Sequence, residues 1–442
     1  MTPALVAALL IAALAALLAI GAPVAVALGL SALVTVLIAS PGDLPSLVNV
    51  LFGVPLRPTL LPVPLFIVMG LVLGQSALVR HLIDFADRLV GRLPGGLGVV
   101  TVVTGIFFAG ISGSGPADVA ALGAILIPAL VASGYARPRA AALLAASGGL
   151  GIVVPPSIAL ILYAFVAQGG VQDFLMNHPG TVATAPSIER LFLGGVIPGI
   201  LLGLAMALLL VFTARRHGIG RGRPRAEGIP TSHLAVRALP GLLVPVLILG
   251  GIYSGLFTAT QSAAVVTLYA LIVEIVLFRE MRWRAVGDAL WRAGRTTAQV
   301  LLLVGCASMF SHALVLLELD RPAVEALRSL AHSPLTFLLA LNLVVLALGC
   351  VIDAISILFI ITPIALPVAL GLGVDPVHLG VILVVNLAIG QITPPVGVNL
   401  FVAASVSGER LGPICRAVVP FVIVELIVLA LVSAIPALCL AG

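Results

Sequence analysis

The chain has 442 residues, of which 61% are hydrophobic and 9% are charged, and its mean hydropathy is +1.28. About a quarter of the residues of a soluble domain are charged, so this composition excludes an ordinary soluble protein. The net charge of +5 is the difference between 22 arginines and 17 acidic residues, and the chain has no lysine. The arginines stand in short clusters between apolar runs rather than on one solvated face, which disfavours a nucleic-acid-binding protein.

The apolar runs predict an all-α polytopic membrane protein. A β-barrel would need strands of alternating polarity, which the sequence lacks, and lipid cannot satisfy the edge of an open sheet. The first run, residues 4–39, has no basic segment before it and is too long for a removable signal peptide or one upright span, so we predict two spans around Gly21-Ala22-Pro23. The predicted helices are 4–20, 22–40, 60–79, 97–131, 136–169, 190–213, 237–254, 258–278, 296–317, 335–370, 376–407 and 414–440.

Two of these segments, 97–131 and 335–370, are longer than a single span and have a polar break near the middle. The first break extends from Gly110 to Pro116, and the second from Gly349 to Asp353. A segment of this kind can enter the membrane, turn and leave on the same side. We therefore predict two re-entrant helical hairpins.

Two other segments, 136–169 and 376–407, contain consecutive prolines. Such a pair removes two N–H donors and frees carbonyl groups upstream, and irregular backbone at membrane depth persists only where protein buries it or where it lines a cavity. We therefore predict two discontinuous helices that line a binding site. The predicted helix breaks are Pro155, Pro156, Pro394 and Pro395.

Matching residues recur at equal spacings in the two halves of the chain. An aspartate precedes a proline by ten residues in each hairpin, and a polar residue precedes each Pro-Pro pair by eight. These residues are Asp118 and Pro128, Asp353 and Pro363, Ser147 and Pro155, and Asn386 and Pro394. The spacing predicts an internal duplication, with repeats at 1–213 and 237–442 joined by an arginine-rich linker at 214–236.

The duplication also predicts how the halves lie in the membrane. Each half crosses five times, and an odd number of crossings makes the two repeats inverted. If the linker is cytoplasmic, 18 of the 22 arginines lie on that side, as the positive-inside rule requires. The exceptions are Arg57, Arg190, Arg321 and Arg328. Both termini are then predicted to lie outside, on the face opposite the linker.

Inverted repeats with paired discontinuous helices indicate a transporter whose site lies near the membrane midplane. A broken helix offers N–H groups to an anion and free carbonyl groups to a cation, without placing a full charge in lipid. We expect the two hairpin tips to converge with the two Pro-Pro breaks.

Three segments resemble the large membrane subunit of TRAP transporters, the DctM type: Ile111–Ala121, Asp375–Gly380 and Asn386–Phe401. The resemblance extends over nearly the whole chain. It implies an elevator-type secondary transporter, not an enzyme, that imports organic anions such as C4-dicarboxylates or sialic acid. It also implies sodium as the coupling ion with no other cofactor, a small membrane (DctQ-type) subunit, and a periplasmic substrate-binding protein. A member of this family is expected in a bacterial inner membrane, so that the two termini, predicted to lie outside, would be periplasmic.

The resemblance also implies site residues. One sodium site is expected at Ser112, Ser114, Ser147 and Gly151, and a second at Gly349, Asp353, Asn386, Gly390 and Thr393. Substrate contacts are expected at Ser157 and Asn399. Gly148-Gly149 stands where the family has a hydroxyl pair, which leaves side chains and backbone carbonyls as alternative ligands at the first site.

Several alternatives remain open at this stage. Asp118 and Asp353 fit either an ion site or a helix cap. The chain could be a standalone sodium/divalent-anion symporter of the same broad superfamily, or a structural scaffold. An intramembrane transferase is disfavoured, because residues 335–408 contain only Asp353 and Asp375 as charged groups. The stretch 170–188 receives no role, and four scattered cysteines predict neither a disulfide framework nor a zinc site.

Overall fold

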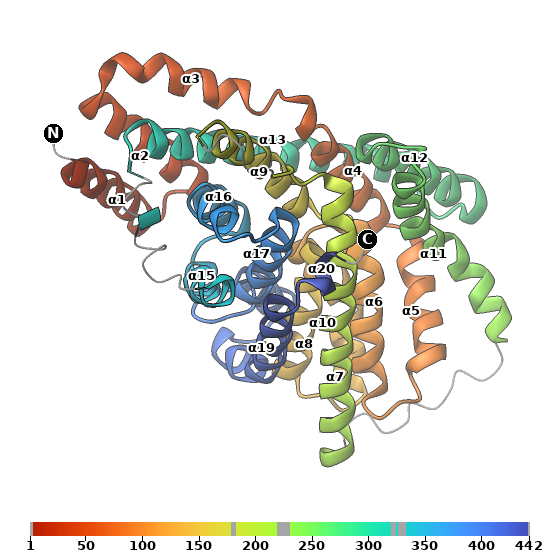
Figure 1. Ribbon diagram of the computed structural model, residues 1–442. Helices are drawn as coiled ribbons and strands as arrows, with labels where there is room; N and C mark the ends of the chain where they lie inside the picture. The colour runs from red at the N-terminus through yellow and green to blue at the C-terminus, as the bar shows by residue number, and fades with distance from the viewer. Residues whose placement is uncertain (1–2, 178–182, 219–229, 320–323, 326–332, 441–442) are drawn as a thin grey trace.

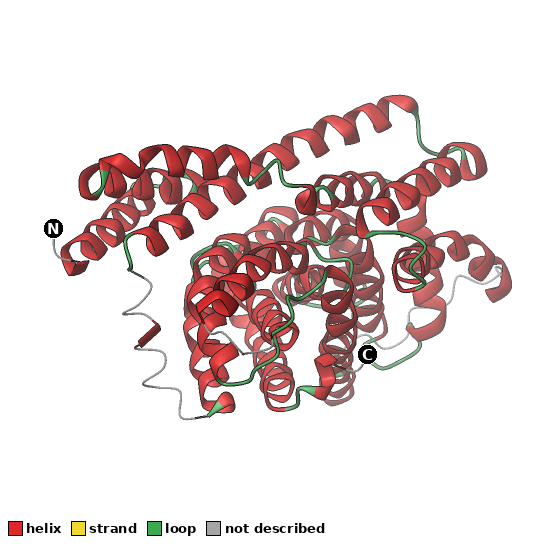
Figure 2. Ribbon diagram, turned by 45° about the horizontal axis from the view of Figure 1, so that its top comes forward, coloured by secondary structure: helices red, strands yellow, loops and turns green. Residues whose placement is uncertain are grey.

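A computed structural model describes residues 3–177, 183–218, 230–319, 324–325 and 333–440. Every regular element in these ranges is a helix, which confirms the all-α polytopic prediction (Figures 1 and 2). Eight helices in them are long and apolar enough to span a membrane, or nine if one bent pair counts as a span.

The helix bounds follow the predicted segments closely. The first half contains α1 (Pro3–Ala19), α2 (Val24–Ala39), α3 (Leu44–Gly53), α4 (Pro62–Gly74), α5 (Ala77–Val90), α6 (Gly96–Ser112), α7 (Gly115–Ala132), α8 (Arg137–Val153), α9 (Ile158–Asn177) and α10 (Ile188–His217). The second half contains α11 (Thr231–Tyr253), α12 (Ala259–Ile272), α13 (Trp283–Leu316), α15 (Pro334–Gly349), α16 (Ala354–Gly371), α17 (Pro376–Gly390), α18 (Val398–Ser407), α19 (Leu411–Ala434) and α20 (Ala437–Leu440).

Both predicted hairpins are present, and local residue types explain where they turn. In the first, α6 ends at Ser112 and is followed by the C-cap Gly113, whose φ of +64° suits a residue without a Cβ atom. In the second, α15 starts at a capping box formed by Ser333 and Thr336, and α16 starts immediately after Asp353. The breaks at Pro155-Pro156 and Pro394-Pro395 are also confirmed, because α8 and α17 end before them and α9 and α18 begin after them.

Three predicted boundaries were wrong. The segment 279–295, which the sequence left between two predicted helices, is mostly helix from Trp283 onward, because Val286, Ala289 and Ala293 are buried on one face of α13. The predicted span 60–79 is shorter and follows an unpredicted helix, α3, and the segments Pro41–Gly53 and Pro58–Gly74 form a pair bent by 42°. The stretch 170–188 begins as the last turns of α9, which extends to Asn177.

The helices form two groups. The peripheral group, α1–α4 and α11–α13, occupies the upper and right-hand border of Figure 1, where α2 packs on α13 and α4 packs on both α12 and α13. The hairpin group, α6–α10 and α15–α20, fills the centre, and α5 connects the groups by packing on α6 and α11.

Within the hairpin group, the two halves of the chain exchange matching contacts. Helix α7 of the first hairpin packs on α8 of its own half and on α18 of the other half. Helix α16 of the second hairpin packs correspondingly on α17 and on α9. This reciprocity agrees with a duplication, while the domain boundaries and the inversion of the halves stay predictions.

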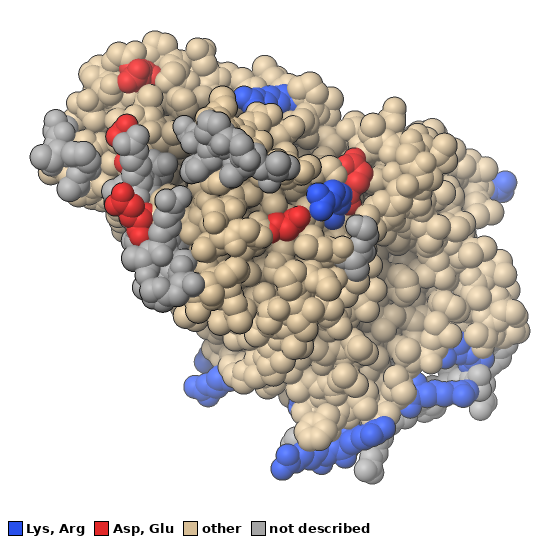
Figure 3. All heavy atoms as spheres, in the orientation of Figure 1, with Lys and Arg blue, Asp and Glu red and all other residues tan. Residues whose placement is uncertain are grey.

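Charge is distributed unevenly over the surface. Figure 3 shows arginines gathered along the lower edge, where α10 ends and α11 begins in Figure 1, whereas the acidic side chains in view lie in the upper part together with a few arginines. The basic lower edge agrees with the positive-inside assignment. Residues 219–229 of the linker, together with Arg321 and Arg328, lie outside the described residues, and the sidedness of the termini stays a prediction.

Candidate functional site

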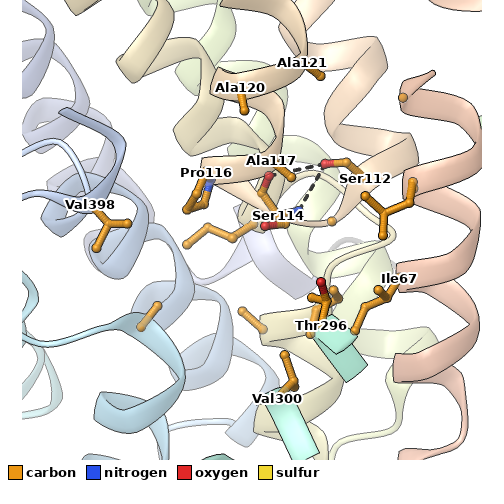
Figure 4. Close-up of a pocket in the computed structure, with 18 of the residues that line it drawn as sticks. Ile67, Ser112, Ser114, Pro116, Ala117, Ala120, Ala121, Thr296, Val300 and Val398 are labelled. Carbon is orange, nitrogen blue, oxygen red and sulfur yellow. Dashed lines mark hydrogen bonds between the residues drawn. The ribbon is translucent and has the colours of Figure 1, made fainter. Parts of the chain in front are cut away.

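A cavity of about 530 Å³ lies between the two groups of helices. Helices α4 and α13 form its peripheral wall, and both hairpin tips form part of the opposite wall (Figure 4). Ile152 and Ile158 flank the first Pro-Pro break and Gln391 and Val398 the second, and all four line the cavity. The structure thus brings the tips and the breaks together, as the sequence predicts.

The first hairpin tip is organised around Ser112. Its hydroxyl donates a hydrogen bond to the carboxylate of Asp118 and accepts one of 3.1 Å from the backbone N–H of Ser114. Ser112 and Ser114 both line the cavity (Figure 4). Asp118 is fully buried, and its Oδ2 has no hydrogen-bond partner in the part of the chain that the structure describes.

Helix α8 approaches this tip so closely that only glycine fits. A Cβ atom at Gly151 would lie 2.3 Å from Asp118 Oδ2, and one at Gly148 would lie 2.9 Å from the carbonyl oxygen of Gly115. Ser147, one turn before Gly151, is buried, and its hydroxyl has no partner among the described residues. Two unpartnered side-chain oxygens, on Asp118 and Ser147, therefore lie in the neighbourhood of the first predicted sodium site.

The second hairpin tip is capped differently. Asp353 accepts hydrogen bonds from the Ser356 backbone N–H at 3.0 Å and from the Ser356 hydroxyl at 2.6 Å. It is therefore the N-cap of α16. Asp118 lies within the first turn of α7, whose N-cap is Ser114, so the two aspartates are not equivalent despite their equal spacing to a proline.

The second tip contacts the second helix break through backbone atoms. A Cβ atom at Gly390 would lie 2.9 Å from the Cα atom of Gly349, and the carbonyl oxygen of Cys350 accepts a 3.2 Å hydrogen bond from the N–H of Val396. Thr393 donates its hydroxyl proton to the carbonyl oxygen of Ile389 at 2.6 Å. The tip and the break thus form one continuous, closely packed unit.

Asn386 is held by a residue that the sequence did not single out. Its amide nitrogen donates to the backbone oxygen of Asn342 at 2.9 Å and to the Asn342 side-chain oxygen at 3.0 Å. Asn342 in turn donates to the hydroxyl of Ser433 at 2.9 Å. The oxygen of the buried Asn386 amide has no partner among the described residues. The sequence did contain a signal for Asn342, because it is a single amide side chain within an otherwise apolar hairpin arm.

The two predicted substrate contacts, Ser157 and Asn399, lie behind the cavity wall. The Ser157 hydroxyl donates to the carbonyl oxygen of Ile152 and accepts a 3.2 Å hydrogen bond from the N–H of Leu160. Asn399 donates to the carbonyl oxygen of Ala145 at 3.2 Å. Both side chains are fully buried, and their role in binding stays a prediction.

Of the predicted site residues, Ser112, Ser114 and Asp353 line the cavity directly. Sequence reasoning missed four polar residues of its wall, which are Gln75, Arg292, Thr296 and Gln391. Arg292 and Thr296 lie on α13, where the arginine-rich run was interpreted as a loop and as a determinant of topology.

Comparison with known proteins gives consistent matches. Residues 11–438 match the family described as "Tripartite ATP-independent periplasmic transporter, DctM component". The chain is 39% identical over 414 residues to the C4-dicarboxylate TRAP transporter large permease protein DctM of Pseudomonas aeruginosa, covering 94% of this chain and 93% of that protein. It is 37% identical over 422 residues to the isethionate TRAP transporter permease protein DctMQ of Oleidesulfovibrio alaskensis, covering 95% of this chain and only 64% of that longer protein.

The fold itself resembles a solved structure. The YdaH transporter of Alcanivorax borkumensis, whose crystal structure was described as having an unusual topology, aligns with a TM-score of 0.63. The alignment covers 90% of this chain and 89% of that one, at 16% sequence identity. At this identity the likeness concerns the fold alone.

Proposed function

The chain belongs to the DctM component family of tripartite ATP-independent periplasmic (TRAP) transporters, and from that premise we propose that it is the large permease subunit of a sodium-coupled transporter importing small organic anions. The observation that carries this proposal is a cavity bounded by both hairpin tips and both helix breaks. Helix termini in such breaks can bind an anion and a cation without placing a full charge in lipid.

The cavity suits a small organic anion. Its volume of about 530 Å³ lies within the range of small-molecule sites, and its wall is largely apolar with a few polar side chains. Relatives of this chain are named for C4-dicarboxylate and isethionate, which carry carboxylate or sulfonate groups. We infer a substrate of this class, such as a C4-dicarboxylate or sialic acid.

The proposed sodium sites lie beside the cavity. At the first, the unpartnered Oδ2 of Asp118 lies against Gly151, and Ser112 bonds the other oxygen of the same carboxylate. Ser114 lies at the same hairpin tip, and Ser147 of α8 has an unpartnered hydroxyl. At the second, Asn386 of α17 has an unpartnered amide oxygen, and the same helix ends at Gly390, which packs against Gly349. In the sequence, Asp353 follows Gly349 by four residues and Thr393 follows Gly390 by three. Oxygen ligands of these kinds suit Na⁺, and this chain offers them at both sites.

The proposed mechanism is an elevator motion in the inner membrane. The hairpin group would carry the tips, and with them the bound anion, past the wall formed by α4 and α13. The proposed partners are a small DctQ-type membrane subunit and a periplasmic substrate-binding protein that delivers the anion.

Uptake in proteoliposomes tests the proposal. We expect uptake of succinate, isethionate or N-acetylneuraminate only when the large subunit, the co-encoded small subunit and the cognate binding protein are present together with an inward sodium gradient. Uptake by the large subunit alone would favour the standalone symporter. Equal uptake with and without the gradient would refute sodium coupling.

A further inference from the structure

The wall of the cavity contains one cationic side chain, Arg292 of α13, whose charge no described carboxylate neutralises. We propose that Arg292 binds the acidic group of the transported anion from the peripheral wall, opposite the first hairpin tip. This inference rests on the proposed function and adds a specificity-determining residue to it.

The charges around the cavity favour an anion at this position. Arg292 and Asp353 are the charged residues that line it, and both oxygens of Asp353 accept hydrogen bonds from Ser356. The salt bridges in the described ranges join other residues, so even Asp288, one turn before Arg292, does not pair with it. Arg292 is exposed and lines the cavity, so a solute that enters can reach its guanidinium group.

The opposite wall provides a complementary feature. Helix α7 begins at Gly115 without a side-chain cap from the described residues, and Pro116 and Ala117 of its first turn line the cavity. The first N–H groups of a helix lack intrahelical partners and carry partial positive charge. Helices α7 and α16 each have an aspartate near the N-terminus, but the two are used differently. At α16 the Asp353 carboxylate accepts the N–H of Ser356, whereas at α7 the Asp118 carboxylate accepts the Ser112 hydroxyl and does not cap the helix. An anion is therefore expected at α7 rather than at α16.

A buried polar side chain points to the same place. Gln391 lines the cavity, is only 9% exposed, and its Oε1 has no partner in the described ranges. This oxygen lies close to the start of α7, since a Cβ atom at Gly115 would lie 2.4 Å from it. The amide thus extends from the second break to the start of α7, where its oxygen can accept a hydrogen bond from a hydroxyl group of the ligand, while the acidic group lies toward Arg292. Figure 4 shows Thr296, one turn after Arg292 on α13, across the cavity from Ser114.

The location of Arg292 has a mechanistic consequence. The start of α7 and Gln391 belong to the hairpin group, whereas Arg292 belongs to the peripheral group. If the hairpin group moves with its substrate, the anion leaves Arg292 behind. Arg292 would then contribute to affinity only in the conformation described here, in which α13 and the first hairpin tip line the same cavity.

The experiment compares Arg292→Gln and Arg292→Lys with Arg295→Gln, a control that removes an exposed arginine of the same helix outside the cavity wall. Binding of succinate, isethionate and N-acetylneuraminate to the purified complex is measured by calorimetry, and uptake is measured in proteoliposomes. For the anion that the wild type binds, we expect Arg292→Gln to raise the Kd roughly tenfold, the worth of one charge-assisted hydrogen bond. The increase should shrink at high salt, because an exposed charge is screened.

The control and conservative variants separate charge from structure. Arg295→Gln should bind like the wild type, and Arg292→Lys should retain part of the affinity, because it keeps the charge but loses the bidentate geometry. An Arg292→Gln protein that binds within twofold of the wild type at every salt concentration would overturn the inference. A wild type that binds an anion without sodium-driven uptake would refute only the proposed function, and one that binds none of the three anions would overturn both.

Discussion

The side-chain amide nitrogen of Asn386 lies 2.9 Å from the backbone oxygen of Asn342 and 3.0 Å from its side-chain oxygen, which joins the second broken helix to the first arm of the second hairpin. Both donor hydrogens of Asn386 are thereby used within the protein, and its oxygen remains available to a cation. Asn342 is thus a positioning residue for the second proposed sodium site.

This relationship predicts that Asn342→Leu weakens sodium binding while Asn342 itself contacts no ion. The substitution removes the side-chain acceptor and leaves only the backbone oxygen of residue 342 to the buried Asn386 amide, so one hydrogen bond is lost at a cost of about 1–3 kcal/mol. We expect the sodium concentration for half-maximal uptake to rise several-fold, and Asn386→Ala to raise it further without a matching fall in expression. Sodium titration of uptake measures both, and unchanged sodium dependence in Asn386→Ala would count against the second site.

The two hairpin aspartates should respond differently to neutralisation. Asp118 keeps an unpartnered oxygen beside α8, so Asp118→Asn should weaken the sodium dependence of uptake. Asp353 caps α16, so Asp353→Ala should lower the free energy of unfolding by about 1 kcal/mol. Thermal unfolding and sodium titration of both variants separate these effects. A larger shift in sodium dependence for Asp353→Ala would reverse the assignment.

The close approach of Gly390 to Gly349 should make substitution there costly. A Cβ atom at Gly390 would lie 2.9 Å from the Gly349 Cα atom, so Gly390→Ala forces the hairpin tip away at a cost of about 1–3 kcal/mol. Gly371→Ala is the matched control, because nothing lies within 4 Å of its Cβ position. We expect reduced uptake and stability for Gly390→Ala alone, as seen in uptake assays and thermal unfolding. Equal behaviour of the two variants would contradict the packing described here.

Gly70 of α4 touches the first hairpin tip across the boundary between the two groups. A Cβ atom at Gly70 would lie 3.0 Å from the Cα atom of Ser112. Gly70→Ala should therefore disfavour this conformation and shift the population toward one in which the tip has moved. Cysteine labelling of an Ala120→Cys reporter in the cavity should slow several-fold in this background, whereas Gly53→Ala, which faces open space, should leave it unchanged. Equal labelling rates would argue against a moving tip.

Local sequence patterns predicted the hairpins and the helix breaks, because Gly113, Asp353 and the Pro-Pro pairs act on their own backbone. The different roles of Asp118 and Asp353 could not be predicted, since equal spacing to a proline does not record where the helix begins. Arg292 was missed for another reason. An arginine in an amphipathic run looks the same in the sequence whether it faces cytoplasm or cavity, and only the packing of α13 against the hairpin group decides.

The most direct test of the central claim is the sodium flux that accompanies the anion. Proteoliposomes that contain the complete transporter are given an inward gradient of the transported anion at equal sodium concentrations on both sides, and entry of radioactive sodium is followed. Coupled transport predicts sodium entry that requires the anion and falls in Asn386→Ala. Anion entry without any sodium entry would contradict the account.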